Sequence, residues 1–137
     1  MRLWHYQLIP YLPKSQLLAQ WRELNSIFKK QDKHILINYI YEYPKDDLYS
    51  YTNMVVKEMT KRGYKIHIDN WCNYFLDGIT YKNIKQPFKN HHNFRYLQQC
   101  FYNLQEKYDR GQKDFSKELY DKLDELMIEE WYKDNPF

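Results

Sequence analysis

The chain has 137 residues, which is enough for one domain with a single modest core and too few for two. No apolar run approaches the roughly 20 residues that cross a bilayer, and the chain opens without the basic-then-apolar pattern of a secretory signal, so we expect a soluble cytoplasmic protein with no membrane contact. The net charge of +3 is uneven, because residues 1–111 hold 17 Lys and Arg against 10 Asp and Glu, whereas residues 112–137 hold 4 against 8. A basic body of this kind attracts polyanions, nucleic acid being the commonest, although a solvated lysine-rich surface has the same composition.

The first helix is predicted to begin near Lys14 or Ser15, since Pro10 and Pro13 suit a helix entrance and not its interior. Apolar residues then recur at helical spacing, at Leu17, Trp21, Leu24 and Phe28. The run ILINYIYEY, residues 35–43, is rich in β-branched and aromatic residues and predicts a short extended segment. A second helix is expected from Asp46 or Asp47 to Arg62, with Gly63 as its terminator.

Residues 64–90 lose clear periodicity and predict a long connection with one short helical turn near Trp71. A third helix should carry its apolar positions from Phe94 to Tyr108 and end at Gly111. The last helix is expected to begin between Asp114 and Ser116. The sequence therefore predicts an all-α fold, one domain over residues 1–137, with about four helices and with residues 112–137 as an acidic C-terminal helix and tail.

Arg22 and Glu23 lie on the first helix, and small residues, Ala19 and Ser26, flank Glu23 at helical spacing. Small neighbours leave a shallow notch through which another group can reach the carboxylate. The plain alternative is a solvated surface glutamate paired with Lys30 or Arg22.

Three short motifs resemble those of the phage pyrimidine-dimer DNA glycosylases, which are also abasic-site lyases. LLAQWREL (residues 17–24) is similar to that family's first helix, KHI (residues 33–35) matches in kind and place, and KEMTKRGYKI (residues 57–66) is similar to the end of its second helix. NHHNFRYLQQC (residues 90–100), around the start of the third helix, is more loosely similar to the family. The opening MRLWHYQLIPYLP is closer still to a group of bacterial relatives with no activity that we can name.

The resemblance implies a mechanism in which the α-amino group of the first residue attacks the sugar C1′ of a damaged nucleotide and forms a Schiff base. An α-amine has a reference pKa of about 7.7–8.0, against about 10.4 for lysine, so a useful fraction is neutral near pH 7. The implied catalytic residues are Met1 as the nucleophile, Glu23 as its assistant and Arg22, which holds a phosphate near the reaction centre.

The resemblance also implies DNA contacts. Arg2 matches an arginine that contacts phosphate, and further cations lie near helix ends, where they suit terminal carbonyls and phosphate alike: Lys33, Lys61, Arg62, Lys107 and Arg110. The expected partner is double-stranded DNA, damaged or abasic, bound by a monomer with no cofactor and no metal. His34 and His92 have two candidate roles, proton transfer in the site and a local hydrogen bond, of which we favour the local hydrogen bond. The adjacent His91 and His92 would point apart on a helix and make a poor metal pair.

The sequence departs from the family at its beginning and on the first helix. The family removes its initiator methionine to expose a threonine, whereas Arg2 is too large for that removal, so Met1 is expected to stay. This alignment places one extra residue between the amine and Glu23. Gln16 and Ser26 stand where the family has a histidine and another basic residue, so a different lesion or only abasic sites are expected as substrates.

Two other functions fit the same residues. One is a non-catalytic nucleic-acid-binding relative that uses the same basic face, and the other is a protein-interaction module that docks through the acidic last helix. The aromatic-basic WYK, residues 131–133, is interpreted as an accidental echo of a DNA-contacting segment in the family, because it follows a helix that phosphate repels.

Overall fold

The computed structural model describes residues 1–136, and within them it contains helices and no strand. In chain order the elements are the 3₁₀ helix η1 (Tyr6–Tyr11), α1 (Lys14–Lys30), the 3₁₀ helix η2 (Asn38–Glu42), α2 (Lys45–Lys61), α3 (Asp69–Tyr74), α4 (Phe94–Asp109) and α5 (Lys117–Asp134). The predicted all-α fold, with four long helices and an irregular connection between the second and third, is confirmed.

The helix ends follow from prolines, glycines and one serine. Pro13 and Pro44 directly precede α1 and α2. Gly63 and Gly111 follow α2 and α4 with φ of +80° and +82°, the left-handed conformation that closes a helix at little cost for glycine. The Ser116 hydroxyl caps α5 by accepting a hydrogen bond from the Leu119 amide at 3.1 Å. The predicted start of α1 and the predicted start and end of α2 were therefore correct to within about two residues.

The expectation of an extended segment at residues 35–43 was wrong. The chain instead turns after His34, whose carbonyl accepts from the amides of Ile37 and Asn38, and continues into η2. Among the described residues no strand exists to pair with such a segment, whereas the three-residue spacing of Ile37 and Ile40 buries both side chains on one side of a 3₁₀ helix. The sequence also gave no indication of η1.

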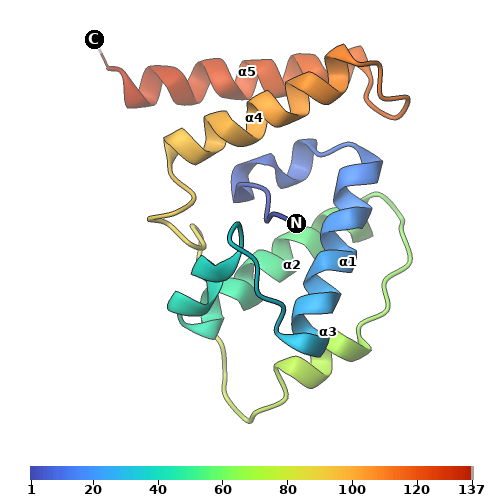
Figure 1. Ribbon diagram of the computed structural model, residues 1–137, viewed down its shortest axis with the longest axis vertical. Helices are drawn as coiled ribbons and strands as arrows, with labels where there is room; N and C mark the ends of the chain where they lie inside the picture. The colour runs from blue at the N-terminus through green and yellow to red at the C-terminus, as the bar shows by residue number, and fades with distance from the viewer. Residues whose placement is uncertain (137) are drawn as a thin grey trace.

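The helices form two layers with the N-terminal segment between them (Figure 1). The antiparallel pair α4 and α5 makes one layer, and α1 packs against α2 and α3 in the other. Residues 1–12 lie between these layers, and η1 contacts both α2 and α5. Leu3, Leu8 and Leu12 of this segment are fully buried, so the beginning of the chain is part of the core.

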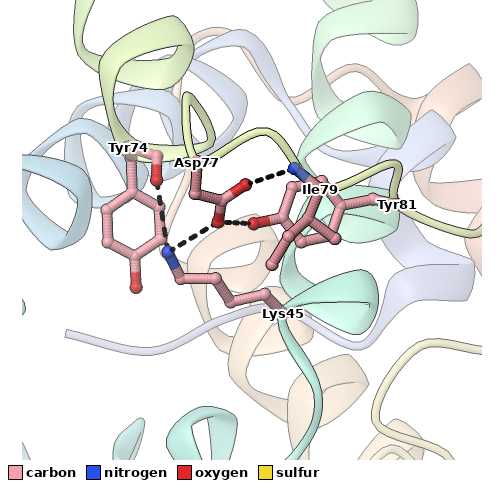
Figure 2. Close-up of polar contacts among 5 residues, drawn as sticks. All are labelled: Lys45, Tyr74, Asp77, Ile79 and Tyr81. Carbon is pink, nitrogen blue, oxygen red and sulfur yellow. Dashed lines mark hydrogen bonds and ion pairs between the residues drawn. The ribbon is translucent and has the colours of Figure 1, made fainter.

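The connection after α3 is fastened to the first turn of α2. Figure 2 shows the Lys45 ammonium donating to the Tyr74 carbonyl at 3.2 Å and pairing with Asp77 at 3.6 Å, while Asp77 also accepts from the Tyr81 hydroxyl. Asp47, which is buried, accepts from the Phe88 amide at 2.9 Å. The predicted irregular connection is therefore a fixed part of the fold.

Candidate active site

The N-terminal segment is held beside α1 by hydrogen bonds to its backbone. The Leu3 carbonyl accepts from the Tyr96 hydroxyl at 2.5 Å, and the Trp4 carbonyl accepts from the Tyr51 hydroxyl at 2.6 Å. The Trp4 amide donates to Oε1 of Gln20 at 2.8 Å. Three helices, α1, α2 and α4, thus fix residues 2–4, and Figure 1 shows the N-terminus in the middle of the fold next to α1.

Gln20 links this segment to Glu23. Its Nε2 donates to the Arg2 carbonyl and to Oε2 of Glu23, both at 3.2 Å. Its Oε1 also accepts from the Tyr51 hydroxyl at 3.0 Å. The predicted catalytic carboxylate is therefore joined to the start of the chain through one buried amide.

The Glu23 carboxyl is half-buried, and opposing effects act on its pKa. Burial is the largest effect and raises the pKa above its usual value. The charge of the Met1 α-amino group, the Arg2 backbone amide, the charge of Arg22 and the Gln20 amide all lower the pKa, in that order, without cancelling the effect of burial. The Met1 amine acts on the carboxyl through space, because the described part of the chain contains no direct ion pair between them.

Arg22 is exposed at the edge of a basic groove of about 420 Å³ between α1 and α3. An amide hydrogen bond of 3.3 Å from Asn70 to Asn25 joins the two helices there. The groove is lined by Trp21, Arg22, Asn25, Ser26, Lys29, Lys30, His67 and Asn70. Three positive charges and neutral amide groups along one groove match the chemistry of a phosphate backbone.

A comparison with protein-family models matches residues 1–71 to the pyrimidine dimer DNA glycosylase family. The match spans just over half of the chain, from the N-terminal amine through α1 and α2 into α3. The chain belongs to this family. The expected resemblance is confirmed, and with it the assignment to a family of DNA glycosylases that act on pyrimidine dimers. No curated protein and no solved structure matches the chain.

The glycosylase-family region contains most of the predicted site residues. Met1, Arg2, Arg22, Glu23, Lys33, Lys61 and Arg62 lie inside the matched range, whereas Lys107 and the whole of α5 lie outside it. The roles of all these residues remain predictions, and their surroundings differ.

Arg2 is engaged within the fold. Its guanidinium carbon lies 5.9 Å from the ring centroids of both Trp4 and Tyr96, and its Nη1 lies 3.9 Å from the Cys100 sulfur. This packing holds residue 2 in place and thereby holds the Met1 amine near Glu23. A phosphate contact by Arg2 would use the remaining donors of the guanidinium.

Arg62 makes structural hydrogen bonds. Its Nη1 and Nη2 donate to the Leu12 and Pro10 carbonyls at 2.8 and 3.2 Å, and its Nε approaches Glu58 at 3.4 Å. The arginine therefore ties the end of α2 to the turn between η1 and α1. DNA contact stays a prediction for Arg62, but its guanidinium already has three partners.

The three predicted lysines are not gathered around Glu23. Lys33 is exposed, with its ammonium 6.0 Å from the ring centroid of Tyr41. Lys61 borders a separate hollow of about 390 Å³ between η1 and α2. Lys107 lies in the last turn of α4. The structure thus brings together Met1, Arg2, Arg22 and Glu23 and leaves the lysines apart.

The histidines have the local roles that we expected. His92 is buried, accepts from the Tyr6 amide at 3.2 Å and lies 2.5 Å from the Tyr39 hydroxyl. Burial lowers its pKa to about 2 and that of the neighbouring His5 to about 4, so both rings are neutral. His34 is exposed and accepts from the Leu36 amide. In residues 1–136 no three His, Cys, Asp or Glu side chains form a metal-binding group, and no helix there is long and apolar enough to cross a membrane.

Three residues of the site were missed from the sequence: Gln20, Tyr51 and Tyr96. Gln20 did carry a signal, since it lies three residues after Leu17 and four before Leu24, on the apolar face of α1. A polar side chain on a core face needs buried hydrogen-bond partners. Tyr51 and Tyr96 gave no such signal, because packing alone explains an aromatic residue at a core position.

Proposed function

We propose that the chain is a DNA glycosylase with abasic-site lyase activity, in which the Met1 α-amine is the nucleophile and Glu23 assists it. The observation that supports this most directly is the position of the N-terminal segment, which places the amine close enough to Glu23 for its charge to lower the pKa of the carboxyl. Both groups lie in the region that matches the glycosylase family.

The chemistry begins with the neutral amine. Its lone pair forms a bond to the sugar C1′ while the bond from C1′ to the base breaks, and the base leaves with that electron pair and takes up a proton. The Glu23 carboxylate stabilises the positive charge that develops on the sugar. Loss of the amine proton and opening of the sugar give a Schiff base, after which removal of a C2′ proton expels the 3′ phosphate and cuts the strand.

The preferred substrate is an abasic site or a lesion smaller than the family's usual one. Two first-helix positions that are basic in the family are neutral here, and each is tied down within the protein. Gln16 exchanges hydrogen bonds with Gln112 at 3.1 and 2.8 Å, and the Ser26 hydroxyl donates to Asp32. Neither side chain is free to hold a bulky lesion, whereas Arg22 remains exposed beside the groove.

Borohydride trapping on a duplex with one abasic site tests the proposal. The protein with a free N-terminus should give a covalent adduct, and the same protein with its amine blocked by acetylation should bind the duplex equally well and give none. Binding without any adduct would replace the enzyme with the non-catalytic DNA-binding relative. The absence of both binding and adduct would leave the docking function of the acidic helix.

A further inference from the structure

We propose that Gln20 is a positioning residue that orients the Glu23 carboxylate and sets its distance from the N-terminal amine. This inference rests on the proposed function, because it assigns Gln20 a part in that reaction. Gln20 lies within LLAQWREL, but the resemblance assigns it no role, and the inference comes from its contacts.

The contacts of Gln20 use its full hydrogen-bonding capacity. Its Oε1 accepts from the Trp4 amide at 2.8 Å and from the Tyr51 hydroxyl at 3.0 Å, and its Nε2 donates to the Arg2 carbonyl and to Glu23, each at 3.2 Å. The side chain is 1% exposed. Four partners on three parts of the chain leave the amide a single orientation, in which one N–H points at the carboxylate.

Gln20 thus holds both groups of the proposed reaction, the N-terminal amine and the Glu23 carboxylate. The amine belongs to residue 1, and Gln20 holds the backbone that follows it, at residues 2 and 4. The carboxylate lies one helical turn after Gln20 and is held by the same Nε2. A shift of the amide therefore moves amine and carboxylate relative to each other, and small displacements of this kind cost large factors in rate.

Other groups facing Glu23 cannot replace Gln20. Arg22 and the Met1 amine supply positive charge, the Arg2 amide comes from the N-terminal segment, and the Tyr51 hydroxyl lies across the site on α2. Of these, Tyr51 contacts Gln20 and the Trp4 carbonyl but makes no hydrogen bond to Glu23 among the described residues. Tyr51 therefore anchors the N-terminal segment, and Tyr51→Phe is the matched control for the pKa of Glu23.

The experiment compares Gln20→Met, which keeps the volume and removes the amide, with Tyr51→Phe, which weakens the anchor and keeps the amide next to Glu23. For Gln20→Met we expect the trapping rate at saturating abasic duplex to fall at least tenfold, with the Kd for the duplex within twofold of the unaltered protein. As pH is lowered, the trapping rate of Gln20→Met should begin to fall at a higher pH than that of the unaltered protein, because the missing donor no longer favours ionised Glu23. The fall should also be steeper. Tyr51→Phe should lower the melting temperature without moving this acid limb.

Carbon NMR of the Glu23 carboxyl gives a readout that does not depend on activity. The pKa of Glu23 should rise in Gln20→Met and stay in place in Tyr51→Phe. If Gln20→Met does not fold, the unaltered protein still decides, because its Gln20 side-chain amide signals should be protected from exchange and should shift as Glu23 titrates.

Three results would overturn the inference: an unchanged Glu23 pKa and trapping rate in folded Gln20→Met, the same rise in the Glu23 pKa in Tyr51→Phe, or Gln20 amide signals that do not respond to the Glu23 titration. A protein that traps no abasic DNA would instead remove the proposed function, and the NMR result would still show whether Gln20 controls Glu23.

Discussion

The half-buried Glu23 carboxyl has a raised pKa, because burial disfavours its charged form. A half-buried carboxyl whose pKa is raised binds its proton more tightly in the folded chain than in the unfolded one. Stability then falls as pH rises through that pKa, so at neutral pH the ionised carboxylate destabilises the fold. A carboxylate kept at such a cost is typical of catalytic positions.

Glu23→Gln should therefore separate activity from stability. We expect trapping on abasic duplex to fall by at least about a hundredfold, in line with the loss of a general acid–base group. The midpoint of urea unfolding at pH 7 should stay level or rise, because no charge remains to be buried. A variant that loses activity and unfolds at much lower urea concentration would show that Glu23 serves the fold instead.

The buried pair His5 and His92 makes the fold sensitive to acid. Their ring centroids lie 5.3 Å apart, and burial depresses both pKa values below the 6.5 of an unfolded histidine. The unfolded chain therefore binds more protons than the folded one below about pH 6.5, so stability is complete above that pH and is lost as pH falls toward the folded values of about 4 and 2.

Replacing His92 by glutamine should remove part of this dependence. Glutamine can still accept from the Tyr6 amide and donate to Tyr39, but it does not titrate. Between pH 6 and 4.5 we expect the slope of unfolding free energy against pH to lessen by about 1.4 kcal/mol per unit, the value for one proton. His34→Gln makes the same change at an exposed histidine and is the control. Equal slopes for both variants would contradict the account of His92.

At the residue scale, the sequence identified groups that carry charge and missed those that place them. Arg22 and Glu23 are the motif residues to which the resemblance assigns roles, so the resemblance identified them. Gln20 and Tyr51 act through hydrogen bonds between α1, α2 and residues 2–4, and such contacts depend on how helices pack. A polar residue on an apolar face was the one signal available, and it showed that Gln20 needs partners without showing which.

Among the elements, α2 is joined to the η1–α1 turn by hydrogen bonds from Arg62. Its guanidinium replaces water for the Pro10 and Leu12 carbonyls, and hydrogen bonds from a charged donor contribute about 1.5–3 kcal/mol each. The turn is what directs the N-terminal segment back into the fold. Arg62 therefore supports the site from a distance.

Arg62→Ala should lower the unfolding free energy by about 2 kcal/mol, measured by urea denaturation, because two carbonyls lose their donor. The Kd of the folded variant for duplex DNA should change less than twofold. The adjacent Lys61→Ala is the control and should leave stability within about 0.5 kcal/mol, as is usual at an exposed position. A large loss of affinity with intact stability would support the DNA contact predicted for Arg62 over this structural role.

The groove between α1 and α3 carries the prediction for DNA binding. Replacing Lys29 and Lys30 by glutamine removes two of its charges. We expect weaker binding to duplex DNA and a log–log salt dependence shallower by about 1–2, since each lost phosphate contact releases roughly one counterion fewer. Lys117 and Lys122 on α5, changed in the same way, should leave the salt slope unaltered. Equal effects from the two pairs would mean that net charge alone governs binding.

Elements with strong periodicity were predictable, and those that depend on a neighbour were not. The apolar residues at helical spacing in α1 and the Pro and Gly residues at helix ends act locally, so the helix positions could be predicted from the sequence. The β-branched residues at 35–43 favour a strand, but burial of Ile37 and Ile40 against the helices overrides that preference. Tertiary packing decided that segment.

The whole molecule separates its charges. Figure 1 shows α5 along one edge of the fold and the α1–α3 pair at the other end, so the acidic helix lies away from the basic groove. Acidic residues on α5 would repel phosphate, and this separation lets duplex DNA approach the groove without meeting them. The N-terminus lies between the two regions, in the middle of the fold.

We propose that the α-amine of Met1, held beside Glu23, is the group that attacks DNA. The most direct measurement is to trap the adduct on an abasic duplex with borohydride, digest the protein and locate the modified peptide by mass spectrometry. We expect a single modification, on the α-nitrogen of Met1. A modification on a lysine, or a free N-terminal protein that forms no adduct, would contradict it.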